Sequence, residues 1–372
     1  MQFKAAVLHE VGQRLVIESV ELGELKPLDV LVRVQASGLC HTDLEVIQGS
    51  LGYPLPIVLG HEGAGIVEQV GSAVTQVRPG DHVVCSWNPH CGHCFYCERD
   101  QPILCEPFSR HQPAGHQLDG TSRYRLGSGS RQGEKLHHFS VMSSHAQFCV
   151  VPESGAVRVP VEIPFDRACL IGCGVMTGVG AALYAAGVTP GSSVAVFGCG
   201  GVGDSVIQGA RLGGATTIIA VDIDPRKLEW AKQFGATHTV NAKEVDPIAR
   251  IKELTGGNGV NFSFEAVGKP QTLEQALFCR DLAGTCVLIG VPGPGPTLNL
   301  DLQRFFDTGG HLCVSWYGDC LPTRDFPLLA EWYRQGQLKL DEIVTRTISL
   351  DETDEAFAAM ERGETLRSVI VF

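Results

Sequence analysis

Residues 194–222 read VAVFGCGGVGDSVIQGARLGGATTIIAVD, and this stretch decides which fold we expect. It contains two short apolar runs suited to buried strands, separated by an apolar-periodic segment suited to a helix. Gly198, Gly200 and Gly203 follow the G-x-G-x-x-G order and open that helix, while Asp222 closes the second run. A strand, a glycine turn, a helix and a second strand that ends on an acid make a βαβ unit for a dinucleotide.

The glycine turn is the predicted binding site for the pyrophosphate of that dinucleotide. Glycine permits the tight turn and the close backbone approach, and the helix N-terminus offers free N–H groups and the positive end of its dipole. Asp222 would accept hydrogen bonds from the adenosine ribose and repel a 2′-phosphate, which favours NAD over NADP, while the neighbouring Arg226 and Lys227 weaken that preference. The alternative is a glycine-rich turn in an ordinary α/β sheet. The expected cofactor-binding residues of this unit are Gly198, Gly200, Gly201, Val202, Gly203, Asp222 and Lys227.

Length and composition narrow the class of protein. A chain of 372 residues predicts two domains, each with its own core. We expect no membrane partner, because no apolar run reaches the length of a span, and the N-terminal residues lack the apolar core of a signal peptide. The net charge of −12 argues against a nucleic-acid surface. Fourteen cysteines in such a chain favour reduced thiols and metal sites, and therefore the cytosol.

The two halves of the chain have different patterns. Short β-rich runs in residues 1–90 predict a compact β domain, whereas the alternating helices and strands after Pro164 predict a doubly wound parallel sheet. Residues 109–145 are polar and loop-rich, and they form either a surface loop or a wall of a substrate cleft. In the second case one of four arginines would meet an anionic group: Arg110, Arg123, Arg125 or Arg131.

Four cysteines in a C-x₂-C-x₂-C-x₇-C pattern predict a closed metal site. Thiolates this close in sequence suit a tetrahedral Cys₄ zinc that stabilises a lobe and leaves no open position for chemistry. An iron–sulfur cluster fits less well, because Glu106 stands between the last cysteine and Pro107. Free thiols without a metal are the remaining alternative. The expected structural zinc ligands are Cys91, Cys94, Cys97 and Cys105.

Three further residues supply two thiolates and one imidazole. Taken alone, Cys40 is more typical of a buried structural thiol, and His61 of an ordinary buried histidine. With Cys173 they make a three-ligand set that suits catalytic zinc with one open position. Their spacing along the chain does not establish that they meet.

Several motifs together resemble the zinc-dependent medium-chain alcohol dehydrogenases over essentially the whole chain. They are GLCHTD (38–43), GHEGAGIVEQVGSAVTQVRPGD (60–81), the cysteine quartet, IGCGVMTGVGAA (171–182) and GCGGVG (198–203). The resemblance implies an α/β fold in which a Rossmann domain is inserted into a GroES-like, β-rich catalytic domain. The expected division is 1–174 for the catalytic domain with a zinc lobe at about 89–106, 175–316 for the NAD-binding domain, and 317–372 for a return segment.

The resemblance also implies a role for individual residues. Cys40, His61 and Cys173 would bind catalytic zinc, which makes two zinc ions per chain with the Cys₄ site. Helix caps and surface charges are the plain alternatives for several of the other residues. The remaining implied roles are proton acceptance by Thr42, orientation of His61 by Asp43, a place behind the metal for Glu62, bracing of the nicotinamide by Thr177, and pyrophosphate contacts by His41 and Arg367.

The implied activity is NAD-dependent oxidation of a primary alcohol, or of an S-hydroxymethyl thiol adduct, by hydride transfer from a zinc-bound alkoxide. The adduct is considered because residues 234–246 and 315–322 are similar to mycothiol-dependent formaldehyde dehydrogenases. Leu51 stands where the glutathione-dependent branch has an acid, and Glu45 stands where other branches have a relay histidine. One rival is an alcohol:acceptor oxidoreductase that holds NAD tightly, and another is a non-catalytic zinc- and nucleotide-binding protein. The resemblance further implies a homodimer or homotetramer, for which residues 297–302 are the expected edge strand.

Overall fold

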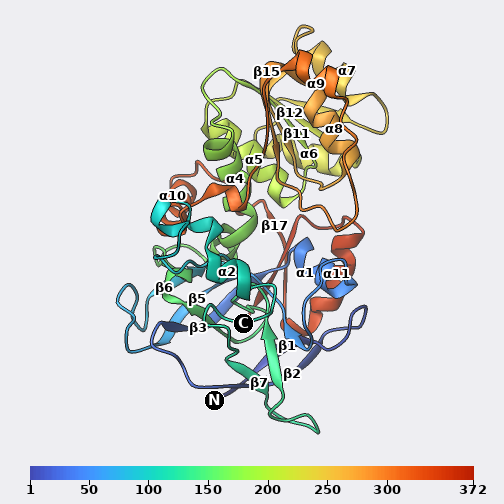
Figure 1. Ribbon diagram of the computed structural model, residues 1–372. Helices are drawn as coiled ribbons and strands as arrows, with labels where there is room; N and C mark the ends of the chain where they lie inside the picture. The colour runs from blue at the N-terminus through green and yellow to red at the C-terminus, as the bar shows by residue number, and fades with distance from the viewer. The chain divides into compact units, whose positions relative to one another are not determined.

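The computed structural model describes all 372 residues, which form two compact units (Figure 1). The first unit consists of Met1–Cys173 together with Leu321–Phe372, and the second unit is Gly174–Cys320. The C-terminal segment belongs to the first unit because its last strand, β18 (Arg367–Val371), pairs with β3 (Asp29–Gly38). The first unit is therefore built from both ends of the chain.

The first unit is rich in short antiparallel strands. Its alternating apolar residues fill the interior, as with Phe3, Ala5 and Val7 on the first strand, all of which are buried. Five strands close a barrel: β1 (Gln2–Leu8), β2 (Val16–Leu22), β7 (Tyr124–Leu126), β8 (Lys135–His138) and β4 (Ile57–Val58). A second sheet has the order β10 (Ala156–Arg158), β6 (His82–Cys85), β5 (Glu62–Val70), β3, β18 and β17 (Val344–Ile348), with β9 (Phe148–Pro152) also paired to β3.

The second unit is a parallel sheet with helices on both faces. Its strand order is β13 (His238–Asn241), β12 (Thr217–Asp222), β11 (Ser193–Phe197), β14 (Val260–Glu265), β15 (Arg280–Leu288) and β16 (His311–Val314). The connecting helices are α5 (Gly201–Leu212), α6 (Pro225–Phe234), α7 (Pro247–Leu254) and α8 (Pro270–Phe278). Helix α5 packs on α6 and α7 packs on α8, as expected for a doubly wound fold (Figure 1). The predicted Rossmann fold is confirmed, and the strand order reverses between β11 and β14, where such sheets bind ligands.

Two expectations about individual segments are wrong. Residues 297–300 form no strand, and Leu302 begins helix α9 (Leu302–Thr308), because the Asp301 side chain caps it by accepting a hydrogen bond from the Arg304 N–H. The edge of the sheet is β16 instead. The second wrong expectation is that no apolar run reaches the length of a membrane span. A helical run of 21 residues, Phe165–Ala185, is long and apolar enough to cross a membrane. Because 78% of its most apolar window is buried within the protein, it has the character of a core helix.

Candidate catalytic metal centre and nucleotide site

Four side chains of the first unit converge on one buried point. The candidate ligand atoms of Cys40, His61, Glu62 and Cys173 all lie within 4.8 Å of one another, and each residue is buried. They come from the start of α1 (His41–Gln48), the start of β5 and the π-helical segment η4 (Ile171–Val175). Two thiols, an imidazole and a carboxylate form a donor set that suits zinc. The structure thus brings together the three residues that sequence spacing left apart, and adds Glu62.

Asp43 holds two members of this cluster in place. Its carboxylate accepts hydrogen bonds from the backbone N–H of Cys40 at 3.2 Å and of Gly60 at 2.9 Å, and lies 3.3 Å from His61 Nδ1. Burial lowers the pKa of His61, but Asp43 and then Cys40 raise it well above its ordinary value. Since Nδ1 is engaged by Asp43, Nε2 of His61 is the nitrogen left for a metal.

Glu62 and Arg367 form an ion pair behind the thiols. The Glu62 carboxylate lies 3.4 Å from the Arg367 guanidinium, which also donates a hydrogen bond to the Leu39 carbonyl at 2.9 Å. Burial raises the pKa of Glu62 to about 7, while Arg367 lowers it. Gly38 makes room for this carboxylate, because a Cβ there would lie 2.2 Å from Glu62 Oε2. Both Glu62 oxygens are buried and accept no hydrogen bond, so the cluster fits a cation.

Three residues of helix α1 extend the cluster. The Thr42 hydroxyl lies 3.8 Å from the Cys40 sulfur, and His41 is exposed. Glu45 stands three residues after Thr42, on the same face of the helix. Burial, and then the nearby Cys40, raises the pKa of the Glu45 carboxyl. The hydrogen bond with Cys173 contributes most to lowering the pKa of the Cys40 thiol, so Cys40 favours the thiolate that a metal needs.

The cysteine quartet forms a second, separate cluster in the first unit. Its four sulfur atoms lie within 4.8 Å of one another, with Cys94 and Cys97 at 3.5 Å. The backbone N–H of Cys91 donates to the Cys105 sulfur at 3.3 Å. Burial raises the pKa of Cys94, but backbone N–H donors, first that of Glu106, bring it to about 6. The exposed His93 bonds the Cys91 carbonyl at 2.8 Å and takes no part in the cluster. These four thiols fit a tetrahedral zinc site.

The glycine turn of the second unit has the geometry of a nucleotide site. Gly198 has a φ of 92°, and a Cβ on Gly203 would lie 1.8 Å from the Gly198 carbonyl oxygen, so both positions require glycine. Helix α5 begins immediately after this turn. Asp222, at the end of the adjacent strand β12, accepts a hydrogen bond from the Cys199 N–H at 2.8 Å. The βαβ unit therefore has both its helix N-terminus and its acid in the predicted places.

Comparison with known proteins agrees with these sites. Residues 201–335 match the family model for zinc-binding dehydrogenases, and residues 26–161 match that for the alcohol dehydrogenase GroES-like domain. An alcohol dehydrogenase zinc-binding domain protein from Burkholderia ambifaria is 38% identical, with a TM-score of 0.95 over 100% of this chain and 99% of that chain. The chain belongs to the zinc-binding alcohol dehydrogenase family.

Two more relatives are known by a substrate or by a bound cofactor. Benzyl alcohol dehydrogenase from Acinetobacter calcoaceticus is 35% identical, with a TM-score of 0.94 over 100% of this chain and 99% of that chain. A putative zinc-binding dehydrogenase from Sinorhizobium meliloti 1021, whose structure contains NADP, is 26% identical, with a TM-score of 0.82 over 100% of both chains.

The polar segment 109–145 is more ordered than its composition suggests, and its arginines have separate roles. Arg123 is buried in an ion pair with Asp29, Nη2 to Oδ1 at 3.1 Å, so it joins the start of β7 in the barrel to β3 of the second sheet and does not face a substrate. Arg131 pairs with the Glu134 carboxylate at 2.6 Å. Arg125 donates to the Gly133 carbonyl at 3.0 Å. Arg110, exposed at the end of α2 (Glu106–His111), is the member of the four without such a contact.

Sequence reasoning missed the aromatic residues around the metal cluster. The Phe139 ring lies edge-on to the His61 ring, with centroids 5.3 Å apart, and the Tyr53 ring lies 5.0 Å beyond it. No local spacing links positions 53, 61 and 139, because each comes from a different loop. Only the fold brings these three rings into one row.

Proposed function

We propose that this chain is an NAD-dependent dehydrogenase of primary alcohols. The observation that carries the proposal is the buried set of Cys40, His61 and Cys173, with their ligand atoms within 4.8 Å of one another. Such a set suits a metal that keeps a position open for substrate, whereas the Cys₄ cluster fills its coordination with protein. The family's fold supports a nicotinamide acceptor for the hydride.

Zinc held by Cys40, His61 and Cys173 would supply Lewis acidity that eases ionisation of an alcohol hydroxyl. The protein's own contribution is positioning and proton transfer. Asp43 fixes the imidazole plane through its 3.3 Å contact with His61. The Thr42 hydroxyl, beside the Cys40 sulfur, would accept the proton of the alcohol, and Glu45 on the same helix face would offer a carboxylate for the next transfer.

The choice of NAD rests on Asp222 and on the engagement of Arg226. Arg226 forms an ion pair with Asp224 at 2.7 Å, which leaves the negative charge of Asp222 less compensated at the adenosine ribose. Because the structure of one relative contains NADP, the preference for NAD over NADP has to be measured for this chain itself. Asp222→Ala should lower the preference for NAD, measured as the ratio of kcat/KM for NAD and NADP, by about 10- to 100-fold. An unchanged ratio would mean that residues other than Asp222 determine the choice between NAD and NADP.

Two substrate classes follow from the comparisons and the motifs. A relative that is a benzyl alcohol dehydrogenase favours a free primary alcohol. The motif resemblance of residues 234–246 and 315–322 favours an S-hydroxymethyl thiol adduct as the second candidate. NADH formation from benzyl alcohol, 1-butanol, and formaldehyde with mycothiol, glutathione or no thiol separates them. A formaldehyde rate that does not depend on thiol removes the adduct.

Cysteine variants test the two proposed zinc sites. Cys173→Ala should lose one zinc and at least about 10³-fold in turnover, because several kcal/mol of charge stabilisation disappear. Cys97→Ala should lose the other zinc and melt about 10 °C lower, with turnover retained by the folded fraction. Cys149→Ala, at a buried thiol outside both clusters, is the control. Wild-type protein with two zinc ions per chain that reduces NAD with none of these substrates would refute the enzyme proposal.

Gel filtration tests the rival that recycles its cofactor in place. NAD that stays bound through the column, together with turnover only when a second carbonyl acceptor is present, would favour the alcohol:acceptor oxidoreductase. NADH that accumulates freely in solution favours the dehydrogenase. A protein that binds zinc and NAD but turns over no alcohol in either assay would be the non-catalytic relative.

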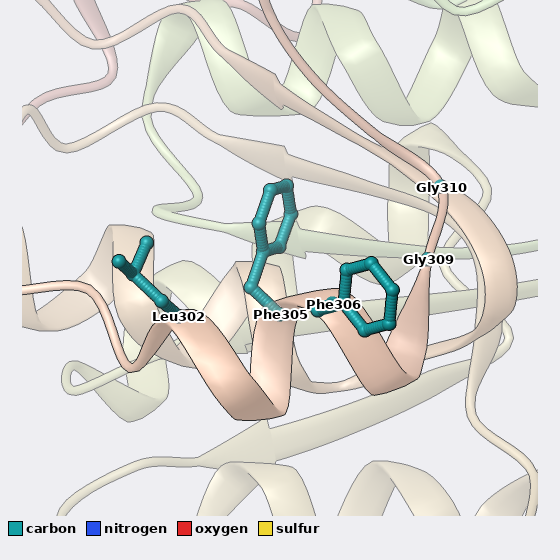
Figure 2. Close-up of a pocket in the computed structure, with 5 residues that line it drawn as sticks. All are labelled: Leu302, Phe305, Phe306, Gly309 and Gly310. Atoms are coloured by element: carbon teal, nitrogen blue, oxygen red, sulfur yellow. The ribbon is translucent and has the colours of Figure 1, made fainter.

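We propose assembly into a homodimer or homotetramer through the free edge of the second unit. Strand β16 pairs only with β15, and Val314 on this edge is 63% exposed. Leu302 and Phe306 on α9 are 72% and 82% exposed and line an apolar hollow with Phe305, Gly309 and Gly310 (Figure 2). A second copy would cover both. A monomeric mass in solution by light scattering would rule this out.

A further inference from the structure

Two short segments of the chain carry the first two candidate metal ligands. We call residues 37–40 the cysteine segment, because it ends at Cys40, and residues 59–61 the histidine segment, because it ends at His61. The cysteine segment follows from the end of β3, and the histidine segment lies between β4 and β5. The geometry of the metal cluster therefore depends on how far apart these two segments are held. A distant residue, His145, is 0% exposed and bonds to both of them.

The contacts of His145 are made by its backbone and by its ring. Its backbone N–H donates to the Leu59 carbonyl at 3.0 Å, in the histidine segment. Its imidazole Nε2 lies 3.3 Å from the Gly38 carbonyl oxygen, in the cysteine segment. Gly60 has a φ of 94°, and a Cβ there would overlap both the backbone nitrogen and the ring of His145. The ring is thus packed directly on one segment while it bonds to the other.

The choice of an imidazole at this position is informative. Burial lowers the pKa of His145, so the ring is neutral and carries a single N–H. The Gly38 carbonyl can only accept, so the network assigns this hydrogen to Nε2. Nδ1 is buried without a hydrogen-bond partner, and a phenyl ring would fill the same space without that cost. Packing alone therefore does not call for histidine, and its specific contribution is the N–H toward Gly38.

The neighbouring Ser144 makes the same connection with weaker groups. Its hydroxyl lies 2.7 Å from the Ser37 hydroxyl, and its backbone N–H donates to the Gly60 carbonyl at 2.9 Å. Asp43 joins the two segments independently, by accepting the backbone N–H groups of Cys40 and Gly60. The cysteine and histidine segments are therefore tied together by two separate sets of hydrogen bonds.

We propose that His145 is a positioning residue of the metal centre, which fixes the spacing between the cysteine and histidine segments and so the angle at which Cys40 and His61 would meet a metal. The inference rests on the proposed function only in that this cluster must bind a metal. Groups that orient ligands without touching the ion change its affinity and geometry, because ligands that have to be reoriented on binding cost free energy.

Three substitutions at one position test this. His145→Phe keeps an aromatic ring but loses the N–H, His145→Gln has an amide N–H that can reach the place of Nε2, and His145→Asn carries the same amide on a shorter side chain. Zinc affinity of the Cys40 cluster, measured by competition with a chelator, should fall about tenfold in His145→Phe and His145→Asn and recover in His145→Gln. His82→Phe, at a histidine of the same unit that packs on Phe165, is the matched control and should bind zinc as wild-type protein does.

Cobalt provides a signal that a general loss of stability does not move. Co²⁺ exchanged into the protein absorbs visible light at wavelengths set by the geometry of its ligands. The spectrum of Cys173→Ala supplies the contribution of the Cys₄ site, which is subtracted. The remaining bands should shift in His145→Phe and stay at their wild-type wavelengths in His145→Gln and His82→Phe.

The possible outcomes separate this inference from the proposed function. Wild-type zinc affinity and wild-type cobalt bands in His145→Phe overturn the inference alone. If His145→Phe does not fold, equal zinc affinities of His145→Gln and His145→Asn overturn it as well. Wild-type protein whose Cys40 cluster binds neither zinc nor cobalt overturns the inference and the proposed function together. Wild-type protein that binds zinc there but oxidises no alcohol overturns the proposed function alone.

Discussion

The two units bury charge in different ways. In the first unit the buried acids have partners: Asp43 accepts two backbone N–H groups and contacts His61, Glu62 faces Arg367, and Asp29 faces Arg123. In the second unit Asp204 is fully buried in the first turn of α5, and neither of its oxygens has a hydrogen-bond partner. These acids of the first unit face a cation, an imidazole or N–H donors, and Glu265 of the second unit likewise accepts N–H donors, whereas burial without such partners makes Asp204 favour its neutral form.

The surroundings of Asp204 agree with that interpretation. Burial raises the pKa of Asp204 well above its ordinary value, Asp222 raises it further and Lys227 lowers it. The residue directly follows Gly203, at the helix end predicted to bind a pyrophosphate. A neutral carboxyl there adds no negative charge opposite the anionic cofactor, whereas an ionised one would oppose binding.

Breaking a buried pair of the first unit should have the largest effect on stability. Arg123→Met leaves the Asp29 carboxylate buried without its partner and should cost about 3–5 kcal/mol, seen as a lower melting temperature. Arg125→Met, two positions further along the chain and exposed on strand β7, is the control and should change little. If both variants melt together with wild-type protein, the buried pair does not stabilise the first unit.

Replacing the unpartnered acid of the second unit should have the opposite sign. Asp204→Asn has nearly the same shape but cannot ionise, so relative to wild-type protein it should gain stability as the pH rises above about 3.9, by up to about 1.4 kcal/mol per unit. A raised folded-state pKa means that the folded protein binds the proton more tightly than the unfolded chain. The contribution of Asp204 to the free energy of unfolding is therefore fully present below the unfolded pKa of about 3.9. It is lost as the pH rises, by about 1.4 kcal/mol per unit, until the pH passes the folded pKa.

Melting curves of wild-type protein and Asp204→Asn between pH 4.5 and 8 check this sign. The two curves should converge toward the acid end and separate as the pH rises. Asp307→Asn, at an exposed acid of the same unit, should follow wild-type protein throughout. A constant difference between wild-type protein and Asp204→Asn at every pH would show that Asp204 does not titrate between the folded and unfolded states.

Sequence reasoning succeeded where the signal is local and was incomplete where partners are distant. The cysteine quartet occupies fifteen positions, 91–105, and the βαβ unit is one continuous stretch, so spacing alone predicts both. Arg123 and Asp29 are 94 positions apart, and no pattern within residues 109–145 predicts that the arginine is buried. The expected strand at 297–302 is wrong because no strand of the sheet pairs with residues 297–300, and Asp301 caps a helix that begins at Leu302.

The candidate metal cluster falls between these extremes. The family resemblance groups Cys40, His61 and Cys173, and the fold adds the hydrogen bonds that spacing cannot provide. Asp43 is the informative member, since it lies three residues after Cys40, as in a capping box, and also contacts His61 across the fold. The local role of Asp43 is readable from sequence, while its long-range contact is not.

Loss of the Asp43 charge should have the smallest of the three effects, and it acts on the metal more than on the fold. Asp43→Asn keeps the size of the side chain and one carbonyl acceptor but removes the charge that faces His61. Zinc affinity should fall about 10- to 100-fold, because an amide holds the imidazole less firmly and makes it a weaker donor. Competition with a chromogenic chelator measures this, with Asp341→Asn, at an exposed acid, as the control. If Asp43→Asn binds zinc as tightly as wild-type protein, the contact between Asp43 and His61 does not strengthen metal binding. The role of Asp43 would then be limited to its two backbone hydrogen bonds.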